Sequence, residues 1–144
     1  MRVIIGNDHA GVAVAEALVE VLREMDCEVK HIGTFSTESV DYPDYAVQVA
    51  KAVASGEYHR GILVCGTGIG MSIAANKVAG VRAALCAEPY SAALSRLHND
   101  ANVLCLGARV LGPGLAEEIL RTWMTTEFSG DRHQRRVDKI NSLD

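Results

Sequence analysis

A cysteine followed by three alternating glycines is the segment of this sequence with the clearest chemical potential: Cys65-Gly66-Thr67-Gly68-Ile69-Gly70. Glycines allow backbone N–H groups to turn inward and approach an anion closely, and a helix that begins after them adds the positive end of its dipole. A thiol at the carboxyl end of a strand, facing a helix start, gains thiolate character and can act as a base or nucleophile. The segment therefore predicts an anion-binding loop beside a reactive Cys65, with a buried and inert cysteine as the alternative.

Familiar phosphate-binding patterns do not match this loop. A dinucleotide fingerprint requires G-x-G-x-x-G, whereas the spacing here is G-x-G-x-G with Met71 in place of the third glycine, although Glu88 lies where such a fold favours an acid. A P-loop requires Gly-Lys followed by Ser or Thr, and that pair is absent. A cysteine phosphatase would place an arginine at Met71. All three interpretations are disfavoured.

Two further segments carry a histidine beside a polar residue. Asp8 and His9 follow the first predicted strand, where a ligand-binding histidine and a structural one are equally consistent with the sequence. His98 and Asn99 end a predicted helix, where both residue types are also favoured simply as C-terminal caps. The residue types alone leave these alternatives open.

The C-terminal tail contains three arginines, at positions 132, 135 and 136. Arg132 and Arg136 lie one helical turn apart, where like charges cost ~0.2 to 0.5 kcal/mol in an isolated helix. A bound anion such as a phosphate would relieve that repulsion. A solvated basic face explains the same residues equally well.

The elements that would position these residues alternate between strand and helix. Short apolar runs predict strands at Arg2–Gly6, Glu28–Gly33, Gly61–Cys65, Val81–Cys86 and Val103–Gly107. Helical spacing predicts helices over Val12–Met25, from Pro43, in a short segment closing at Gly80, over Pro89–Asn99 and over Pro113–Phe128. Five strand–helix units imply an α/β fold with a parallel sheet, right-handed crossovers and helices on both faces. The helical tail at 131–144 has too few apolar positions to fold alone, so we expect it to pack on another element, a partner subunit being one candidate.

Composition and charge narrow the function class. With 49% hydrophobic and 22% charged residues, the 144-residue chain predicts one folded domain over residues 1–144. A net charge of −4 argues against a nucleic-acid partner. No apolar run approaches the ~20 residues of a bilayer span, and no signal-peptide core begins the sequence, so a cytoplasmic location is expected. The four cysteines are widely spaced, as in reduced proteins, and no cluster has metal-ligand spacing, so no metal is expected.

Five sequence segments together resemble the type B ribose 5-phosphate isomerase and galactose 6-phosphate isomerase family. They are Asn-Asp-His-Ala-Gly from Asn7, Cys-Gly-Thr-Gly-Ile-Gly-Met-Ser-Ile-Ala-Ala-Asn-Lys from Cys65, Glu-Pro-Tyr-Ser-Ala from Glu88, Arg-Leu-His-Asn-Asp from Arg96, and Arg-His-Gln-Arg-Arg-Val from Arg132. The resemblance covers nearly the whole chain. It implies a three-layer α/β/α Rossmann-like fold with a five-stranded parallel sheet and an extra C-terminal helix. It also implies a cofactor-free aldose–ketose isomerase that acts on a sugar phosphate through an enediolate.

The resemblance also implies roles for individual residues. Cys65 would move the proton between C2 and C1, His98 would help to open the furanose ring, and Thr67 could pass a proton between oxygens. Asn99 and the backbone of Gly66, Gly68, Ile69 and Gly70 would hold the enediolate oxygen. Asp8 would bind sugar hydroxyls, Tyr42 would line the site, and the phosphate would lie among His9, Arg109, Arg132 and Arg136.

Some relatives use a glutamate later in the loop as the base, but the stretch from Met71 to Asn76 contains no acid. The His-Asn-Asp helix end and the arginine-rich tail favour ribose 5-phosphate over galactose 6-phosphate. Another aldose phosphate, namely galactose 6-phosphate, allose 6-phosphate or a four-carbon sugar phosphate, remains the alternative substrate. A binding module without proton transfer would explain the glycines but not the thiol, histidine and arginines that accompany them.

The predicted helix direction suggests that two subunits share each site. Cys65 ends a strand, whereas the helix over Pro89–Asn99 starts at that edge and runs back, so at 1.5 Å per residue its end lies ~15 Å away. His98 would therefore reach a sugar at Cys65 only from a neighbouring molecule, as in a two-fold dimer. Whether dimers pair into tetramers stays open.

Overall fold

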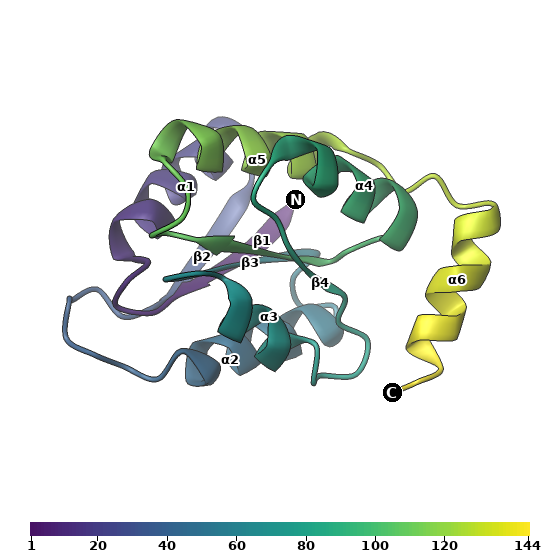
Figure 1. Cartoon of the computed structure of the whole chain (residues 1–144), viewed down its shortest axis with the longest axis horizontal. Helices are drawn as coiled ribbons and strands as arrows, with labels where there is room; N and C mark the ends of the chain where they lie inside the picture. The colour runs from purple at the N-terminus through teal and green to yellow at the C-terminus, as the bar shows by residue number, and fades with distance from the viewer.

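A five-stranded parallel sheet between two layers of helices forms the body of the protein (Figure 1). The computed structural model describes all 144 residues. The strands are β1 (Arg2–Asn7), β2 (Glu28–Gly33), β3 (Arg60–Cys65), β4 (Ala83–Leu85) and β5 (Val103–Gly107). The helices are α1 (Val12–Glu24), α2 (Tyr42–Ala54), α3 (Ile69–Ala75), α4 (Pro89–Asn99), α5 (Pro113–Thr125) and α6 (Arg132–Asn141). The predicted fold class is confirmed.

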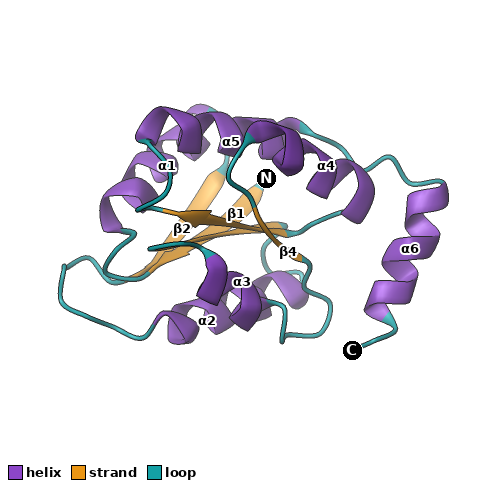
Figure 2. Ribbon diagram, viewed as in Figure 1, coloured by secondary structure: helices purple, strands orange, loops and turns teal.

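The sheet order is β2-β1-β3-β5-β4, so the chain moves from β1 toward one edge and then from β3 toward the other. Helices α1, α4 and α5 cover one face and α2 and α3 the other (Figure 2). In an open parallel sheet, the carboxyl ends of strands flanking such a reversal border the ligand crevice. The topology thus directs attention to the ends of β1 and β3.

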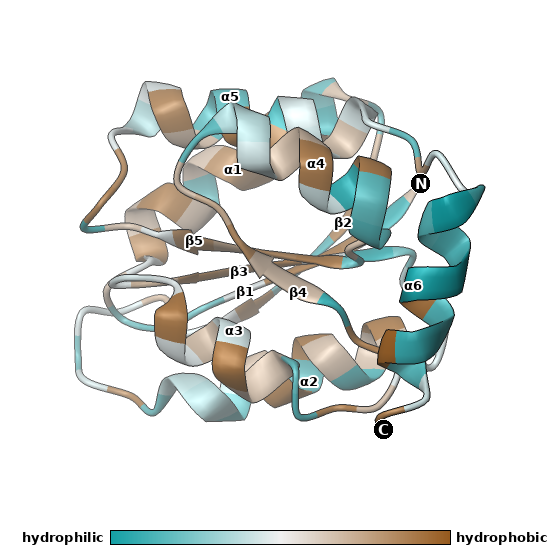
Figure 3. Cartoon of the chain, turned by 45° about the vertical axis from the view of Figure 1, so that its right-hand side comes forward, coloured by the Kyte–Doolittle hydropathy of each residue, from teal (hydrophilic) through white to brown (hydrophobic).

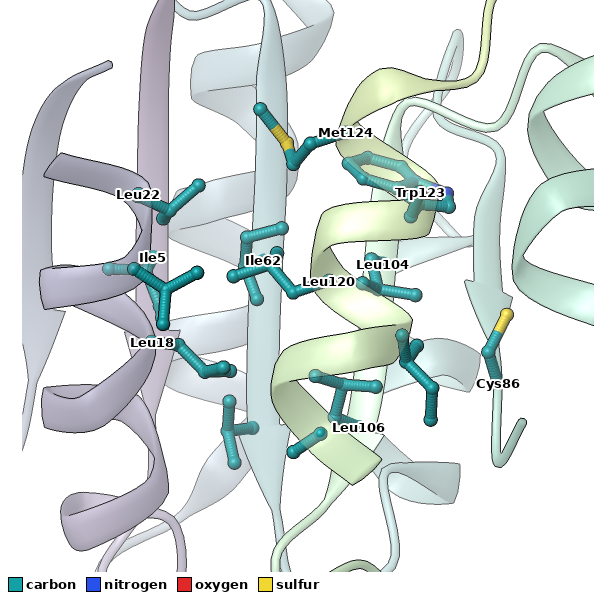
Figure 4. Close-up of a cluster of buried hydrophobic side chains, with 14 of the residues drawn as sticks. Ile5, Leu18, Leu22, Ile62, Cys86, Leu104, Leu106, Leu120, Trp123 and Met124 are labelled. Atoms are coloured by element: carbon teal, nitrogen blue, oxygen red, sulfur yellow. The ribbon is translucent and has the colours of Figure 1, made fainter. Parts of the chain in front are cut away.

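Two hydrophobic clusters fix the helices to the sheet. Successive strand residues alternate between faces, so Ile5 packs toward α1 and α5 while Ile4 packs toward α2. Figure 4 shows the larger cluster, in which Trp123 and Leu120 of α5 lie over Ile62 and Leu104 of the sheet. These side chains are fully buried, so the strands that carry the site residues are fixed by a closely packed core.

The segment between β3 and α4 differs from its predicted boundaries. Helix α3 ends at Ala75, short of Gly80, because the side chain of Asn76 turns to bond both the N–H and the carbonyl of Ala83. Strand β4 covers only Ala83–Leu85, so Cys86 lies just beyond the strand rather than inside it. Helix α5 likewise ends at Thr125, before the predicted Phe128.

Helix α6 packs on α4 of its own chain, beyond the end of α4 and away from the long loop between β2 and α2 (Figure 1). Of its three predicted apolar positions, His133 and Val137 are buried, whereas Ile140 remains 42% exposed. The rest of the helix is strongly hydrophilic (Figure 3). No helix of the structure has both the length and the apolar character needed to cross a membrane.

We predict that Leu104→Ala lowers the free energy of unfolding by ~2 to 5 kcal/mol, because Leu104 is fully buried and its loss leaves a cavity. Leu115→Ala removes the same atoms from a partly exposed position on α5 and should cost about 1 kcal/mol or less. Urea denaturation of both variants measures the difference. Equal losses would contradict the packing described here.

Candidate active site

The pairing of β1 with β3 brings two predicted site segments together. Asn7 lies opposite Val64, and the N–H of Asp8 donates to the carbonyl of Val64 at 3.2 Å. Asp8 and Cys65 therefore leave the sheet side by side. They line a cleft of about 460 Å³ whose wall residues are Asp8, Tyr42, Cys65, Gly66, Thr67, Ile69, Gly70, Ile73 and Arg109.

Cys65 lies at the base of this cleft and is only 4% exposed. Its sulfur accepts a hydrogen bond of 3.2 Å from the N–H of Gly68. This bond fixes the sulfur beside the glycine loop, where it can meet a ligand in the cleft. The predicted contact between the thiol and the glycine loop is present.

The glycine loop follows a path that larger residues would obstruct. Gly68 has a φ of +77°, and a Cβ there would lie 2.9 Å from the backbone of Leu106 in the neighbouring strand β5. Gly70 lies against the ring of Tyr42, where a Cβ would come within 2.5 Å of the ring. The loop is thus held between β5 and the start of α2, with Gly66, Thr67, Ile69 and Gly70 lining the cleft.

Asp8 combines a structural bond with a free acceptor. Its Oδ1 accepts from the N–H groups of Ala10 and Gly11, at 2.9 and 3.2 Å. The second carboxylate oxygen accepts no bond from the protein. It can accept a hydrogen bond from a hydroxyl group of a ligand in the cleft.

His9 is tied to the loop between β2 and α2. The N–H of Val40 donates to His9 Nδ1 at 3.2 Å, so Nδ1 acts as an acceptor and the neutral ring carries its proton on Nε2. At the other end of the loop, the amide of Asn7 donates to the carbonyl of Thr34 and accepts from His31 at 2.7 Å. Burial lowers the pKa of His31, which keeps that ring neutral. The loop is therefore anchored at both ends, next to the cleft.

Six predicted site residues do not line this cleft: His9 and Gly68 only adjoin lining residues in the chain, and the other four lie elsewhere. His98 and Asn99 end α4, and Arg132 and Arg136 lie on α6. The ring of His98 stacks on that of His133, with centroids 4.2 Å apart and an interplanar angle of 10°. Partial burial, followed by the charges of His98 and the two arginines, lowers the pKa of His133. The structure thus forms two groups of predicted site residues, one at Cys65 and one where α4 meets α6.

Sequence reasoning missed one residue that lines the cleft and two that hold the loop beside it. Ile73 lines it one helical turn after Ile69, and that spacing could have identified it. Asn7 and the Val40 N–H hold the neighbouring loop, and nothing in the residue pattern indicated those contacts. No group of three or more His, Cys, Asp or Glu side chains is placed to hold a metal ion.

Comparison with known proteins identifies the family of this chain. The family model described as Ribose/Galactose Isomerase matches residues 3–140. The chain belongs to the ribose/galactose isomerase family. It is 52% identical to ribose-5-phosphate isomerase B of Escherichia coli, covering 99% of this chain and 96% of that one.

Two more members of the ribose/galactose isomerase family are closely similar. A solved structure of Clostridium thermocellum ribose-5-phosphate isomerase B superimposes with a TM-score of 0.97 at 52% identity, covering 99% of this chain and 97% of the other. D-erythrulose-4-phosphate isomerase of Pectobacterium atrosepticum is 43% identical, covering 97% of this chain and 93% of that one. The family resemblance and the Rossmann-like fold expected from it are confirmed.

We predict that Gly68→Ala destabilises the protein by about 2 kcal/mol, because a left-handed φ strains alanine and its Cβ would press on β5. The shift should also weaken the bond to Cys65 and change its alkylation rate. Gly66→Ala is the matched control, since a Cβ there meets Arg109 at an ordinary 3.5 Å. Thermal melts and mass-mapped alkylation test this; equal behaviour of the two variants would contradict it.

Proposed function

We propose that the chain interconverts D-ribose 5-phosphate and D-ribulose 5-phosphate as a cofactor-independent aldose–ketose isomerase. The observation that carries this proposal is the buried Cys65 sulfur at the base of the cleft, hydrogen bonded to the glycine loop. Membership of the family and 52% identity to ribose-5-phosphate isomerase B support the substrate.

The chemistry required is transfer of a proton next to a carbonyl. The Cys65 thiolate removes the C2 proton of the open-chain aldose, the carbonyl oxygen gains negative charge, and an enediolate forms. The same thiol then returns the proton to C1, while the Thr67 hydroxyl passes a proton from O2 to O1. Backbone N–H groups of the glycine loop can stabilise the oxyanion without any reorganisation, which is the largest barrier-lowering effect available to such a site.

The rest of the cleft would hold the sugar in position. The free oxygen of Asp8 accepts a hydrogen bond from a sugar hydroxyl, and Tyr42 lines the cleft beside Gly70. Arg109 and the Nε2–H of His9 are donors suited to a phosphate at the end of the chain. Binding energy from a phosphate distant from C1 and C2 aligns the reacting carbons with Cys65.

A second copy of the chain would complete the site. Ile69 and Ile73 on α3 are 51% and 57% exposed beside the cleft. A groove of about 460 Å³ next to Asn99 is lined partly by apolar residues, including Ile140 of α6 and Leu143 just after it. We propose that α3 of one protomer enters this groove of the other, which brings His98, Asn99, Arg132 and Arg136 to the partner's Cys65. Each chain has both surfaces, so a two-fold dimer closes with two sites.

A four-carbon sugar phosphate is the second candidate substrate, favoured by the 43% identity to D-erythrulose-4-phosphate isomerase. Both reactions need the same base and oxyanion donors and differ in chain length. A panel of aldose and ketose phosphates, ranked by kcat/KM, decides between them.

We predict that Cys65→Ala lowers kcat at least ~100-fold, the usual cost of removing a general base. Iodoacetamide should modify Cys65 in the wild type, and ribose 5-phosphate should slow that reaction. Cys86→Ala is the matched control: burial raises the pKa of Cys86 to about 11, so that thiol stays neutral and unreactive near pH 8. Near-normal kcat in Cys65→Ala would exclude Cys65 as the base, and retained turnover with weaker binding would favour a binding role.

The shared site predicts complementation between two inactive variants. Cys65→Ala and His98→Ala should each be inactive alone, but co-refolded hybrids should contain one site with both residues intact. Activity should therefore reappear in the mixture, as measured against each variant refolded separately. Hybrids confirmed by native mass spectrometry that stay inactive, or an active monomer, would refute the shared site.

A further inference from the structure

The end of α4 is fixed by several segments of the chain. Asp100 ends the helix in a left-handed conformation with φ of 45°. Arg96 Nη1 donates to the Asp100 carboxylate at 2.8 Å and to the carbonyl of Ala101 at 2.6 Å. Ser129, in the segment before α6, donates its N–H and hydroxyl to the carbonyl of Leu97 at 3.1 and 2.8 Å. His98 and Asn99 therefore belong to a helix end that several hydrogen bonds hold in place.

Arg82 adds a contact that none of these residues makes. Its Nε donates to the carbonyls of Asn99 and Asp100 at 3.0 and 3.2 Å, and its Nη2 donates to the Asp100 carbonyl at 2.9 Å. Its Nη1 donates to Asn141 Oδ1 at 3.0 Å. The side chain is 14% exposed. One guanidinium thus connects the end of α4 to the end of α6.

The chemistry of arginine suits this position. The last carbonyls of a helix lack donors from within the helix, and a cation there also complements the helix dipole. The planar guanidinium presents several donors at fixed angles, so it can contact two carbonyls and a third group together, whereas an ammonium cannot reproduce that geometry. Arg82 therefore fixes both distance and direction between the two helix ends.

We propose that Arg82 is a positioning residue that holds the ring-opening group on α4 and the phosphate-binding group on α6 in register. This inference rests on the proposed function. His98 would act near C1, and Arg132 and Arg136 would bind the phosphate at the other end of the same sugar. Their separation must therefore match the length of one substrate molecule. The bond from Arg82 to Asn141 links the two helices across the groove beside Asn99.

The test compares Arg82→Lys, which keeps the charge but loses the fork, with Asn141→Ala, which breaks only the link to α6. Arg121→Lys is the matched control, because Arg121 likewise bridges two helices, bonding Glu117 on α5 and Glu24 on α1, far from α4's end. Steady-state kinetics and hydrogen exchange of the α6 amides are measured for all three. Asn141→Ala also keeps the test valid if Arg82→Lys folds poorly.

We expect Asn141→Ala to raise KM about threefold to tenfold with little change in kcat, as a weakened charge-assisted bond allows α6 to shift. Arg82→Lys should raise KM at least as much and also lower kcat, because it loosens His98 too. Combining the two changes should raise KM no further than Arg82→Lys alone, since both remove the same bond. Protection of residues 132–141 against exchange should fall in both variants and stay normal in Arg121→Lys.

Two outcomes would overturn the proposal. Unchanged exchange in α6 would show that Arg82 does not hold the helix, and faster exchange with unchanged KM and kcat would show a purely structural contact. A wild-type protein without turnover on any aldose phosphate would instead refute the proposed function. The exchange comparison would still decide whether Arg82 couples α4 to α6.

Discussion

The parallel pairing of β1 with β3 is the constraint on which the cleft depends. The register that sets Asn7 opposite Val64 makes Asp8 and Cys65 leave the sheet as neighbours. A shift of β1 by one residue relative to β3 would turn the side chains of β1 to the opposite face and separate Asp8 from Cys65. Gly11 shows how closely the two segments approach, since a Cβ there would lie 2.5 Å from the Val64 carbonyl. The position of both side chains at the cleft thus depends on the hydrogen bonds that pair β1 with β3.

A buried pair of arginines fixes the ends of α4 and α5 around Trp123. The guanidinium groups of Arg60 and Arg96 both lie against the Trp123 ring, at 5.2 and 5.7 Å from its centre. Arg60 donates to the last carbonyls of α5, at Trp123 and Met124. Burial lowers its pKa to about 10, yet the group stays charged at neutral pH and remains paired with those carbonyls. Arg96 contacts Trp123 in the core and also bonds the residues that end α4. It therefore links the core to the helix end that carries His98.

Sequence patterns predicted most of the fold because each strand–helix unit carries its own periodicity. The bounds of β2, β5 and α4 are as predicted, since Gly33, Gly107 and Pro89 mark them locally. At the end of α3, the side chain of Asn76 bonds the backbone of Ala83 on the outer edge of β4. Such a contact depends on tertiary proximity that periodicity does not encode. Strand order was equally inaccessible, because the insertion of β5 between β3 and β4 involves no local signal.

The site residues likewise differ in whether local sequence signals could group them. Asp8 and Cys65 could be grouped from sequence because they lie at the carboxyl ends of parallel strands, which share one edge, whereas Arg109 entered only through the family resemblance. His98 belongs to a helix that runs back from that edge, and its closest ring partner is His133 rather than any residue of the cleft. Because α4 connects the parallel strands β4 and β5, it runs back from that edge, and the proposed function therefore places His98 at the Cys65 of a partner chain. Under the proposed function, the topology itself makes association of two chains part of the catalytic requirement.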